Sequence, residues 1–175
     1  MRLFWRHGYE GVSINDLTNA IGIAPPSLYA AFGSKAALYR EALDRYAGLP
    51  GGTRSLPPAK TLNGMIKSLL RSAADAVTDP SAERGCMVSN GMIQCAAEHA
   101  ELAAELANRR RRTRNEIAGA LTRWLPEDSA HSLARYLNAV MLGLAIQARD
   151  GATRSDLEEV IEEVVTGLRA RERKR

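Results

Sequence analysis

The side chains that could define a chemical site in this sequence are its histidines, its cysteines and a run of arginines. His7, His99 and His131 are scattered and show no metal-ligand spacing. The sequence contains no glycine-rich phosphate loop, no GxSxG, no HExxH and no pair of carboxylates in an apolar setting. We therefore expect no catalytic residue, no metal and no cofactor, and the chain is not predicted to be an enzyme.

The two cysteines, Cys86 and Cys95, are too few for a disulfide scaffold and suit a reducing cytoplasm. On the helix expected over residues 83–97 they lie on opposite sides, because each residue turns a helix by about 100°. Arg84 could lower the pKa of the Cys86 thiol, which leaves a redox or electrophile sensor open. A buried, unreactive cysteine is the favoured interpretation.

The run of arginines at 109–112, with Arg114, has the composition of a nucleic-acid patch. Four successive helical residues spread over about 300° of the helix circumference, so they cannot all face one surface. We favour a solvated face on which these arginines pair with Glu105 and Glu116.

Composition places the chain among globular proteins, since 45% of its 175 residues are apolar and 25% are charged. The longest strictly apolar run, residues 139–146, is far short of the roughly 20 residues that cross a bilayer. The N-terminus leaves no room for a signal peptide, so we expect a cytoplasmic protein with no membrane partner. The net charge of +4 permits an acidic partner such as DNA.

Apolar residues recur at helical spacing along the chain, and no stretch alternates as a strand would. The predicted fold class is therefore all-α. A proline- and glycine-rich stretch at 48–58 is read as a linker or loop between a head, residues 1–47, and a larger body, residues 59–175. In the body we expect helices around 59–78, 83–97, 98–124, 127–149 and 154–170.

The head carries a helix–turn–helix pattern. Ser13 is the expected N-cap of one helix, with Asp16 completing a capping box and Gly22 ending the helix in a left-handed conformation. A short helix at 25–32 begins with two prolines, which lack the N–H groups that a cap would satisfy. The core positions expected in this unit are Ile14, Leu17, Ala20, Ile21, Leu28 and Phe32.

These residues resemble the DNA-binding head of the TetR/AcrR family of bacterial transcriptional regulators. The match runs without gaps through Gly8-Tyr9, Ser13, Leu17, Ile21-Gly22-Ile23, Ser27, Leu28-Tyr29, Phe32, Lys35 and Leu38. The resemblance implies a homodimer with a helix–turn–helix DNA-binding domain at 1–47 and a ligand-binding and dimerisation domain at 59–175. It further implies a repressor that binds a palindromic operator in double-stranded DNA and is released by a small-molecule effector.

The resemblance also assigns DNA-binding positions, namely Ser13, Ala24, Pro25, Pro26, Ser27, Tyr29 and Lys35. Serine, tyrosine and lysine side chains and helix N-termini are ordinary phosphate donors. Ser27 can bond several bases, but no Arg, Asn or Gln lies on its helix to make a bidentate base contact. We expect DNA shape and half-site spacing to supply much of the specificity.

The head departs from the family in its N-terminus and its charge. Relatives normally have a basic arm and most of a first helix before the segment aligned with residues 3–5. Residues 1–47 carry five Lys and Arg against four Asp and Glu, a net charge of +1, which gives weak electrostatic attraction to DNA. We expect basic residues upstream of Met1 in the native chain.

The candidate effector pocket consists of polar and methionine side chains embedded in the apolar helices: Met65, Met87, Asn90, Gln94 and Tyr136. Asn90 and Gln94 would share one helix face, and methionines adapt to varied ligands. A structural role is the alternative for each of them.

The last two helices carry wide apolar stripes, and the resemblance places the dimer interface there. The expected interface residues are Leu133, Leu137, Val140, Leu144, Val160, Ile161, Val164 and Leu168. Burial inside one protomer is the alternative. The acidic pairs Glu158-Glu159 and Glu162-Glu163 lie opposite the stripe and are expected to face solvent.

Together these features predict a dimeric, ligand-released transcriptional regulator. The first alternative is a helical small-molecule-binding protein with little or no DNA affinity, which the low charge of the head favours. A helical enzyme comes third.

Overall fold

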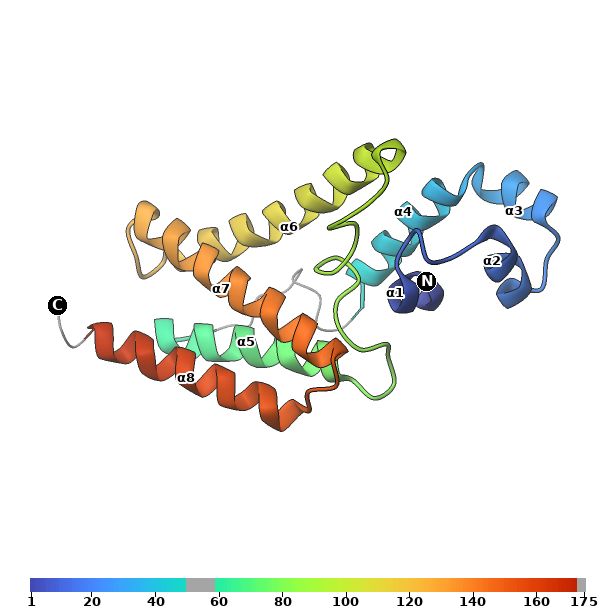
Figure 1. Cartoon of the computed structure of the whole chain (residues 1–175). Coiled ribbons are helices and arrows are strands. Elements are labelled where there is room, and N and C mark those ends of the chain that lie inside the picture. Colours follow the sequence, from blue (N-terminus) through green and yellow to red (C-terminus); the bar gives the residue numbers. More distant parts are fainter. Residues whose placement is uncertain (50–58, 173–175) are drawn as a thin grey trace.

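A computed structural model describes residues 1–49 and 59–172, and within these ranges every regular element is a helix (Figure 1). The all-α prediction is confirmed. A short 3₁₀ turn, Ala97–His99, leads directly into α6. Residues 50–58 of the predicted linker lie outside the described residues. The helices are α1 Arg2–His7, α2 Ile14–Ile21, α3 Pro25–Phe32, α4 Lys35–Ala47, α5 Leu62–Thr78, α6 Ala100–Leu121, α7 Glu127–Arg149 and α8 Arg154–Glu172.

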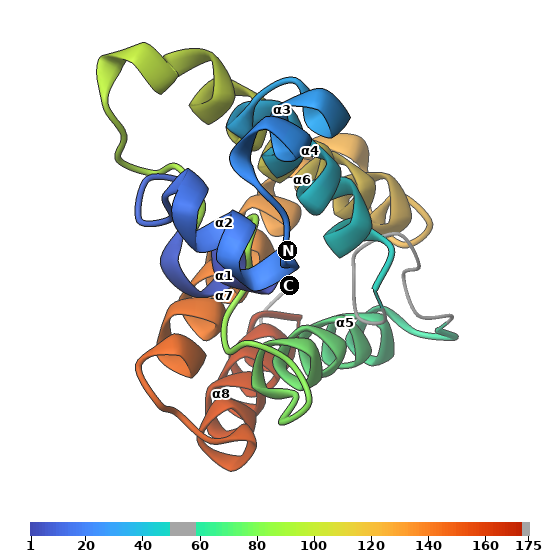
Figure 2. The same cartoon turned by 90° about the vertical axis from the view of Figure 1, so that its right-hand side faces the viewer.

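The four N-terminal helices gather at one end of the molecule, and α5–α8 form the larger part beside them (Figures 1 and 2). Helix α7 packs against both α5 and α6, while α8 packs mainly against α5. The core of this larger part is apolar, with Leu70, Leu121, Leu137 and Ile161 fully buried. The long helices therefore hold together by one continuous apolar core.

Half of the expected dimer-interface residues lie in that core, which corrects the prediction. Leu137, Leu144, Ile161 and Val164 are buried within the single chain, so they do not face a second one. Periodicity identifies the apolar face of a helix but not the surface that covers it, and here α5 covers it. Leu133, Val140, Val160 and Leu168 are only half-buried at the edge of this core.

The helix expected over residues 83–97 is also wrong. The segment runs through turns from Asp79 to the 3₁₀ turn, and Gly85 takes a φ of +83° that interrupts helical geometry. At Gly91 an added Cβ would lie 2.5 Å from Leu106 Cδ2 on α6, so only glycine permits this close approach. Two side chains of this irregular segment, those of Met87 and Met92, are buried.

The N-terminal helices share their core with this segment and with α6. Phe4, Leu28 and Tyr39 are fully buried in one cluster with Met87 and Leu106. The rings of Phe4 and Tyr39 meet edge to face, with centroids 5.0 Å apart. The residues predicted as a separate head therefore pack directly onto residues of the body.

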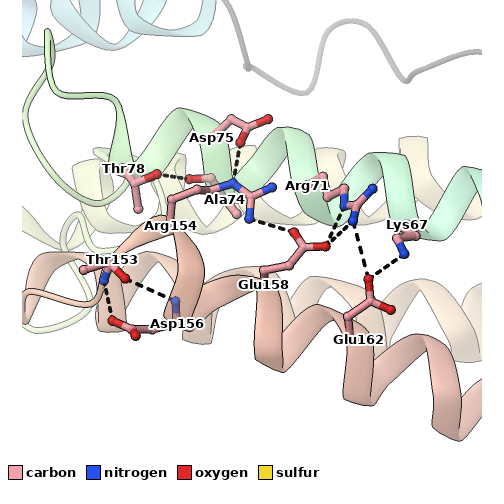
Figure 3. A network of polar contacts seen from close by, with 10 residues as sticks. All are labelled: Lys67, Arg71, Ala74, Asp75, Thr78, Thr153, Arg154, Asp156, Glu158 and Glu162. Atoms are coloured by element: carbon pink, nitrogen blue, oxygen red, sulfur yellow. Dashed lines mark hydrogen bonds and ion pairs between the residues drawn. The ribbon is translucent and has the colours of Figure 1, made fainter.

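A network of ion pairs fastens α8 to α5 on the outside of the core (Figure 3). Arg154 binds Asp75 at 2.5 Å and Glu158 at 2.7 Å, and Glu158 also receives Arg71. Glu162 is 2.5 Å from Lys67 Nζ. Glu158 and Glu162 thus face α5 rather than open solvent as predicted, whereas Glu159 and Glu163 are exposed.

The Glu158 carboxylate makes stability depend on acid pH. Its hydrogen bonds from Arg71, then from Arg154, lower its pKa from 4.5 to about 2. A carboxyl with a lowered folded-state pKa contributes stability above its unfolded-state value, and that contribution is lost as the pH falls through its folded-state value. We expect Glu158→Gln to lower the free energy of unfolding by about 0.5–1 kcal/mol at neutral pH. Near pH 2 the substitution should have little effect.

Urea denaturation at one protein concentration across this pH range measures the difference. Glu159→Gln, the same change at the exposed neighbouring position, serves as control and should shift stability little at any pH. An equal effect of Glu158→Gln at both ends of the pH range would contradict the assignment.

Candidate nucleic-acid interface and cavity

The start of α2 is fixed by the predicted capping box. Ser13 Oγ accepts a hydrogen bond from the Asp16 N–H at 3.1 Å, and Asp16 Oδ2 accepts one from the Ser13 N–H at 2.8 Å. The Ser13 hydroxyl also donates to Asp16 Oδ2 at 2.6 Å. Gly22 ends the helix at φ +78° in the left-handed region, as predicted. These local bonds set the angle at which the chain enters α3.

Helix α3 presents an uncovered front at the outer end of the N-terminal helices (Figure 1). Residues 24–27 are all exposed, and Tyr29 is 48% exposed. Leu28 on the opposite side is fully buried and anchors the helix. The predicted DNA-binding positions on this helix are therefore open to solvent.

Two predicted core residues of this unit are exposed, which corrects the prediction. Ile21 is 50% exposed and Ala20 is exposed. Leu17 is buried as predicted, and Thr18, which was not predicted to be in the core, is buried as well. Thr18 is tolerated there because its hydroxyl donates to the Ile14 carbonyl at 3.0 Å, so no buried polar group is left unpaired.

Lys35 opens α4 behind this surface. Its ammonium lies 4.4 Å from the centroid of the Tyr9 ring, within the range of a cation–π contact. Partial burial lowers the pKa of Lys35, and Glu10 and Asp16 act in the opposite direction. The side chain is half-buried, so its position is set by Tyr9 before any ligand arrives.

A cavity of about 230 Å³ lies where α4, α5, α6, α7 and the irregular segment meet. Alanines and larger apolar side chains from α5 and α7 form one part of its lining, and polar side chains from α6 form another. Its lining residues are Tyr46, Ala47, Ala73, Ala76, Val77, Cys86, Val88, Ser89, Arg109, Arg110, Arg112, Thr113, Glu116, Asn138, Met141, Leu142 and Ala145.

The five predicted pocket residues do not line this cavity. Met65 and Met87 are buried in the two apolar clusters, and Tyr136 is 43% exposed on α7. Asn90 and Gln94 lie together, but in a second, more open hollow between the turn after α1 and residues 90–94. Because residues 83–97 are not a helix, the helical spacing used to place these two side chains does not apply.

Two members of the arginine run, Arg109 and Arg110, depart from the solvated face predicted for it, whereas Arg111 and Arg112 are exposed as predicted. Arg109 binds Asp44 of α4 at 2.6 Å, and Arg110 Nη1 donates to the carbonyls of Val88 and Gly91 at 2.9 Å. Burial lowers the pKa of Arg110, opposed by Tyr39 and Cys86. The spread of four arginines around a helix was itself the missed signal, because some of them must face neighbouring elements.

Helices α4 and α6 are joined by a two-rung ladder of opposite charges. Arg40 Nε lies 2.9 Å from both carboxylate oxygens of Glu105, and Asp44 lies 2.6 Å from Arg109. The members of each pair are one helical turn from the members of the other, with the signs reversed. These two ion pairs fix the orientation of α4 relative to α6. Helix α4 ends at the cavity.

Helix α1 is tied to the same larger part. Trp5 Nε1 donates to the Gly85 carbonyl at 3.1 Å, and Arg6 pairs with Glu83 at 2.8 Å. Arg149, at the end of α7, donates to the carbonyls of Trp5 and Arg6 at 3.2 and 2.5 Å. A shift of the irregular segment or of α7 would therefore pull directly on α1.

Both cysteines are free and partly buried. Arg84, which the sequence places near Cys86, donates to the carbonyls of Ala148 and Ala152. Cys86 lies in the cavity wall and accepts a hydrogen bond from the Ser89 N–H at 3.4 Å. Within the described ranges no three His, Cys, Asp or Glu side chains are close enough to hold a metal, and none of the helices described there is long and apolar enough to cross a membrane.

Comparison with known proteins assigns this architecture to a family. The pattern for bacterial regulatory proteins of the tetR family matches residues 1–42. The HTH-type transcriptional repressor BdcR of Escherichia coli is 32% identical over 85% of this chain and 75% of its own length. The chain belongs to the TetR family.

Two further relatives of this TetR family regulator extend the match beyond the DNA-binding head. The HTH-type transcriptional repressor ComR of Escherichia coli is 29% identical over 97% of this chain and 83% of its own length. A cysteine mutant of the TetR family regulator CifR, complexed with 26-bp double-strand operator DNA, superimposes with a TM-score of 0.87. It is 32% identical and covers 94% of this chain and 90% of its own. The protein is thus a DNA-binding transcriptional regulator.

Removing the Ser13 cap tests how far local bonds hold the TetR-type head. We expect Ser13→Ala to lower the free energy of unfolding by about 1 kcal/mol, because the Asp16 N–H loses its acceptor. Urea denaturation at fixed protein concentration measures the change. The control is Ser72→Ala on the exposed side of α5, where alanine should leave stability unchanged or slightly higher. Equal effects of the two substitutions would show that the cap contributes nothing.

Proposed function

We propose that this TetR family regulator is a homodimeric repressor without catalytic activity. It binds a palindromic operator through its two helix–turn–helix units and leaves the operator when a small molecule occupies the cavity. The uncovered front of α3, residues 24–27 with Tyr29, carries the proposal. The repressors ComR and BdcR and the operator complex of CifR support it.

The proposal divides the chain into a DNA-binding part, residues 1–47, and an effector and dimerisation part, residues 59–175. In the DNA-binding part, Ala24, Pro25, Pro26 and Ser27 face the major groove. Tyr29, Lys35 and the start of α2 at Ser13 contact phosphates on either side of it. The Ser13 hydroxyl donates its one proton to Asp16 in the free protein, so it contacts a phosphate only by turning that proton away from Asp16. The N–H groups at the start of α2 are the other donors at this place.

Operator binding is tested on a labelled duplex from the promoter upstream of the protein's own gene, by fluorescence anisotropy at low salt. We expect Tyr29→Phe to weaken binding severalfold on every sequence tested, because one phosphate contact is lost. Ser27→Ala should largely keep the preference for operator over scrambled DNA, because shape supplies much of the specificity. Ser72→Ala, which removes a hydroxyl from the exposed side of α5 outside every proposed contact surface, is the control.

Two results would count against the proposal. Failure of the unsubstituted protein to prefer the operator would favour the alternative of a small-molecule-binding protein with little DNA affinity. Loss of discrimination in Ser27→Ala would show direct base reading instead of shape reading.

The cavity is the proposed effector site because its walls connect to the DNA-binding helices. Tyr46 and Ala47 are the end of α4, and Cys86 and Val88 belong to the segment that holds α1 through Gly85. An effector that binds one arrangement of these walls better than another shifts the spacing of the two heads. Operator half-sites are one helical turn of DNA apart, about 34 Å. The two heads reach both half-sites only when the distance between the heads matches this separation.

The proposed dimer face differs from the one expected from the sequence. On α7, Tyr136, Ala139, Gly143 and Ile146 follow helical spacing on the side away from the core, and Tyr136 and Ile146 are large and exposed. The half-buried residues Leu133, Val140, Val160 and Leu168 border this stripe and complete the face. Small residues between two larger ones allow two copies of α7 to approach closely.

A charge placed in this face should separate the protomers without unfolding them. Ile146 is 47% exposed in the single chain, so Ile146→Arg is expected to keep the helical circular dichroism while sedimentation shifts from dimer to monomer. Ile93→Arg introduces the same charge at a side chain that is 64% exposed outside this face, and should stay dimeric. A dimeric Ile146→Arg protein would place the interface elsewhere.

A further inference from the structure

The charges that line the cavity are unbalanced. Three guanidinium groups, those of Arg109, Arg110 and Arg112, contribute to its lining, against the single carboxylate of Glu116 among the described residues. Glu116 and Arg112 are exposed, whereas Arg109 and Arg110 are half-buried. The inner polar side of the cavity is therefore positive.

Arg110 is a half-buried cation of this lining without a counter-ion. In the described part of the chain its hydrogen-bond partners are the carbonyls of Val88 and Gly91, and it has no carboxylate within ion-pair distance. Carbonyls orient a guanidinium but leave its charge unneutralised, and a partly buried charge without a counter-ion is costly. An anion entering the cavity would supply the missing counter-charge.

Arg109 is neutralised by Asp44, but through a bond that is easily exchanged. The Asp44 side chain is 66% exposed and the Arg109 side chain 28% exposed, so water can solvate the aspartate when the pair opens. Ion pairs of this exposure contribute about 0–1 kcal/mol. A carboxylate on the cavity side of Arg109 would meet a better desolvated donor, and guanidinium groups bind carboxylates in a bidentate manner.

The remaining lining and the volume limit the rest of the ligand. Ala73, Val77, Met141 and Leu142 supply an apolar surface from α5 and α7. The volume of 230 Å³ exceeds the roughly 150 Å³ of an apolar cavity that binds benzene. A ring or a short alkyl chain bearing one acidic group matches both the space and the lining.

We propose that the effector is a small organic carboxylate with an apolar body, bound by Arg109 and Arg110. Its carboxylate displaces Asp44 from Arg109 and so breaks one of the two ion pairs between α4 and α6. This inference rests on the proposed function, because it names the ligand class of the proposed effector cavity. The Arg40–Glu105 ion pair stays intact. Helix α4 pivots about this pair and moves the helix–turn–helix unit attached to it.

The test uses the full dimeric protein with matched probes that differ in charge alone. The probes are 3-phenylpropanoate and hexanoate, each paired with its neutral amide at equal millimolar concentration. Sodium chloride balances the ionic strength of the amide samples, because DNA affinity falls with salt. Calorimetry measures binding of each probe, and anisotropy measures operator affinity with and without it.

We expect the carboxylates to bind and to weaken operator binding by about tenfold, within the usual range of allosteric coupling. The neutral amides should have a much smaller effect on operator affinity than the carboxylates. Arg109→Gln should abolish carboxylate binding, which is read by calorimetry independently of DNA. Asp44→Asn should bind carboxylate more tightly, since the competing carboxylate is gone, while its operator affinity no longer responds.

Glu41→Gln is the matched control for Asp44→Asn, since it removes an exposed acid from the same helix and should alter neither measurement. Equal binding of amides and carboxylates, or binding of neither, overturns the anion assignment. An Asp44→Asn protein that responds like the unsubstituted one overturns the exchange at Arg109. Operator binding without any probe tests the proposed function separately, so failure of that function is recognised as such.

Discussion

The structure depends on burial that the N-terminal helices cannot provide alone. Tyr39 and Leu28 are fully buried only because Met87, Leu102 and Leu106 close the same cluster from the other side. A unit of this size has too little interior for an independent core, and the irregular segment supplies the missing apolar contacts. The cost is visible in the Tyr39 hydroxyl, which is buried without a hydrogen-bond partner among the described residues, and burial raises the pKa of Tyr39 to about 12.

Because the core is shared, the position of the DNA-binding helices is a property of the whole chain. The same segment that buries Met87 holds Trp5 through the Gly85 carbonyl and forms a wall of the cavity with Cys86 and Val88. Helix α6 takes part on both sides, with Leu106 in the shared core and Arg109 and Arg110 at the cavity. Packed cores transmit small displacements since they have few voids to absorb them. A ligand and an operator can therefore influence each other through contacts that are continuous in space.

Sequence reasoning was accurate where the decisive contacts are local and inaccurate where they are not. The Ser13–Asp16 box and the left-handed Gly22 follow from residues within a few positions of each other, and both are present. Ile21 fits the periodicity yet is half exposed, whereas Thr18, outside the predicted apolar face, is buried with its hydroxyl bonded to the Ile14 carbonyl. Leu137 and Ile161 were assigned to a partner because a pattern of apolar residues does not say whether another helix or another chain covers it.

Three features can be read from the amino-acid sequence alone: the helical fold, the ends of most helices, and the TetR-type helix–turn–helix of the N-terminal residues. Helix propensities, caps and turn glycines act within a few residues, so they can be recognised in the sequence. The path of residues 79–99, the location of the cavity and the partners of Arg109 and Arg110 are apparent only in the folded chain. Those features arise from contacts between residues far apart in the chain, such as Asp44 with Arg109 and Gly91 against Leu106, whose energies depend on burial and approach that no local pattern encodes.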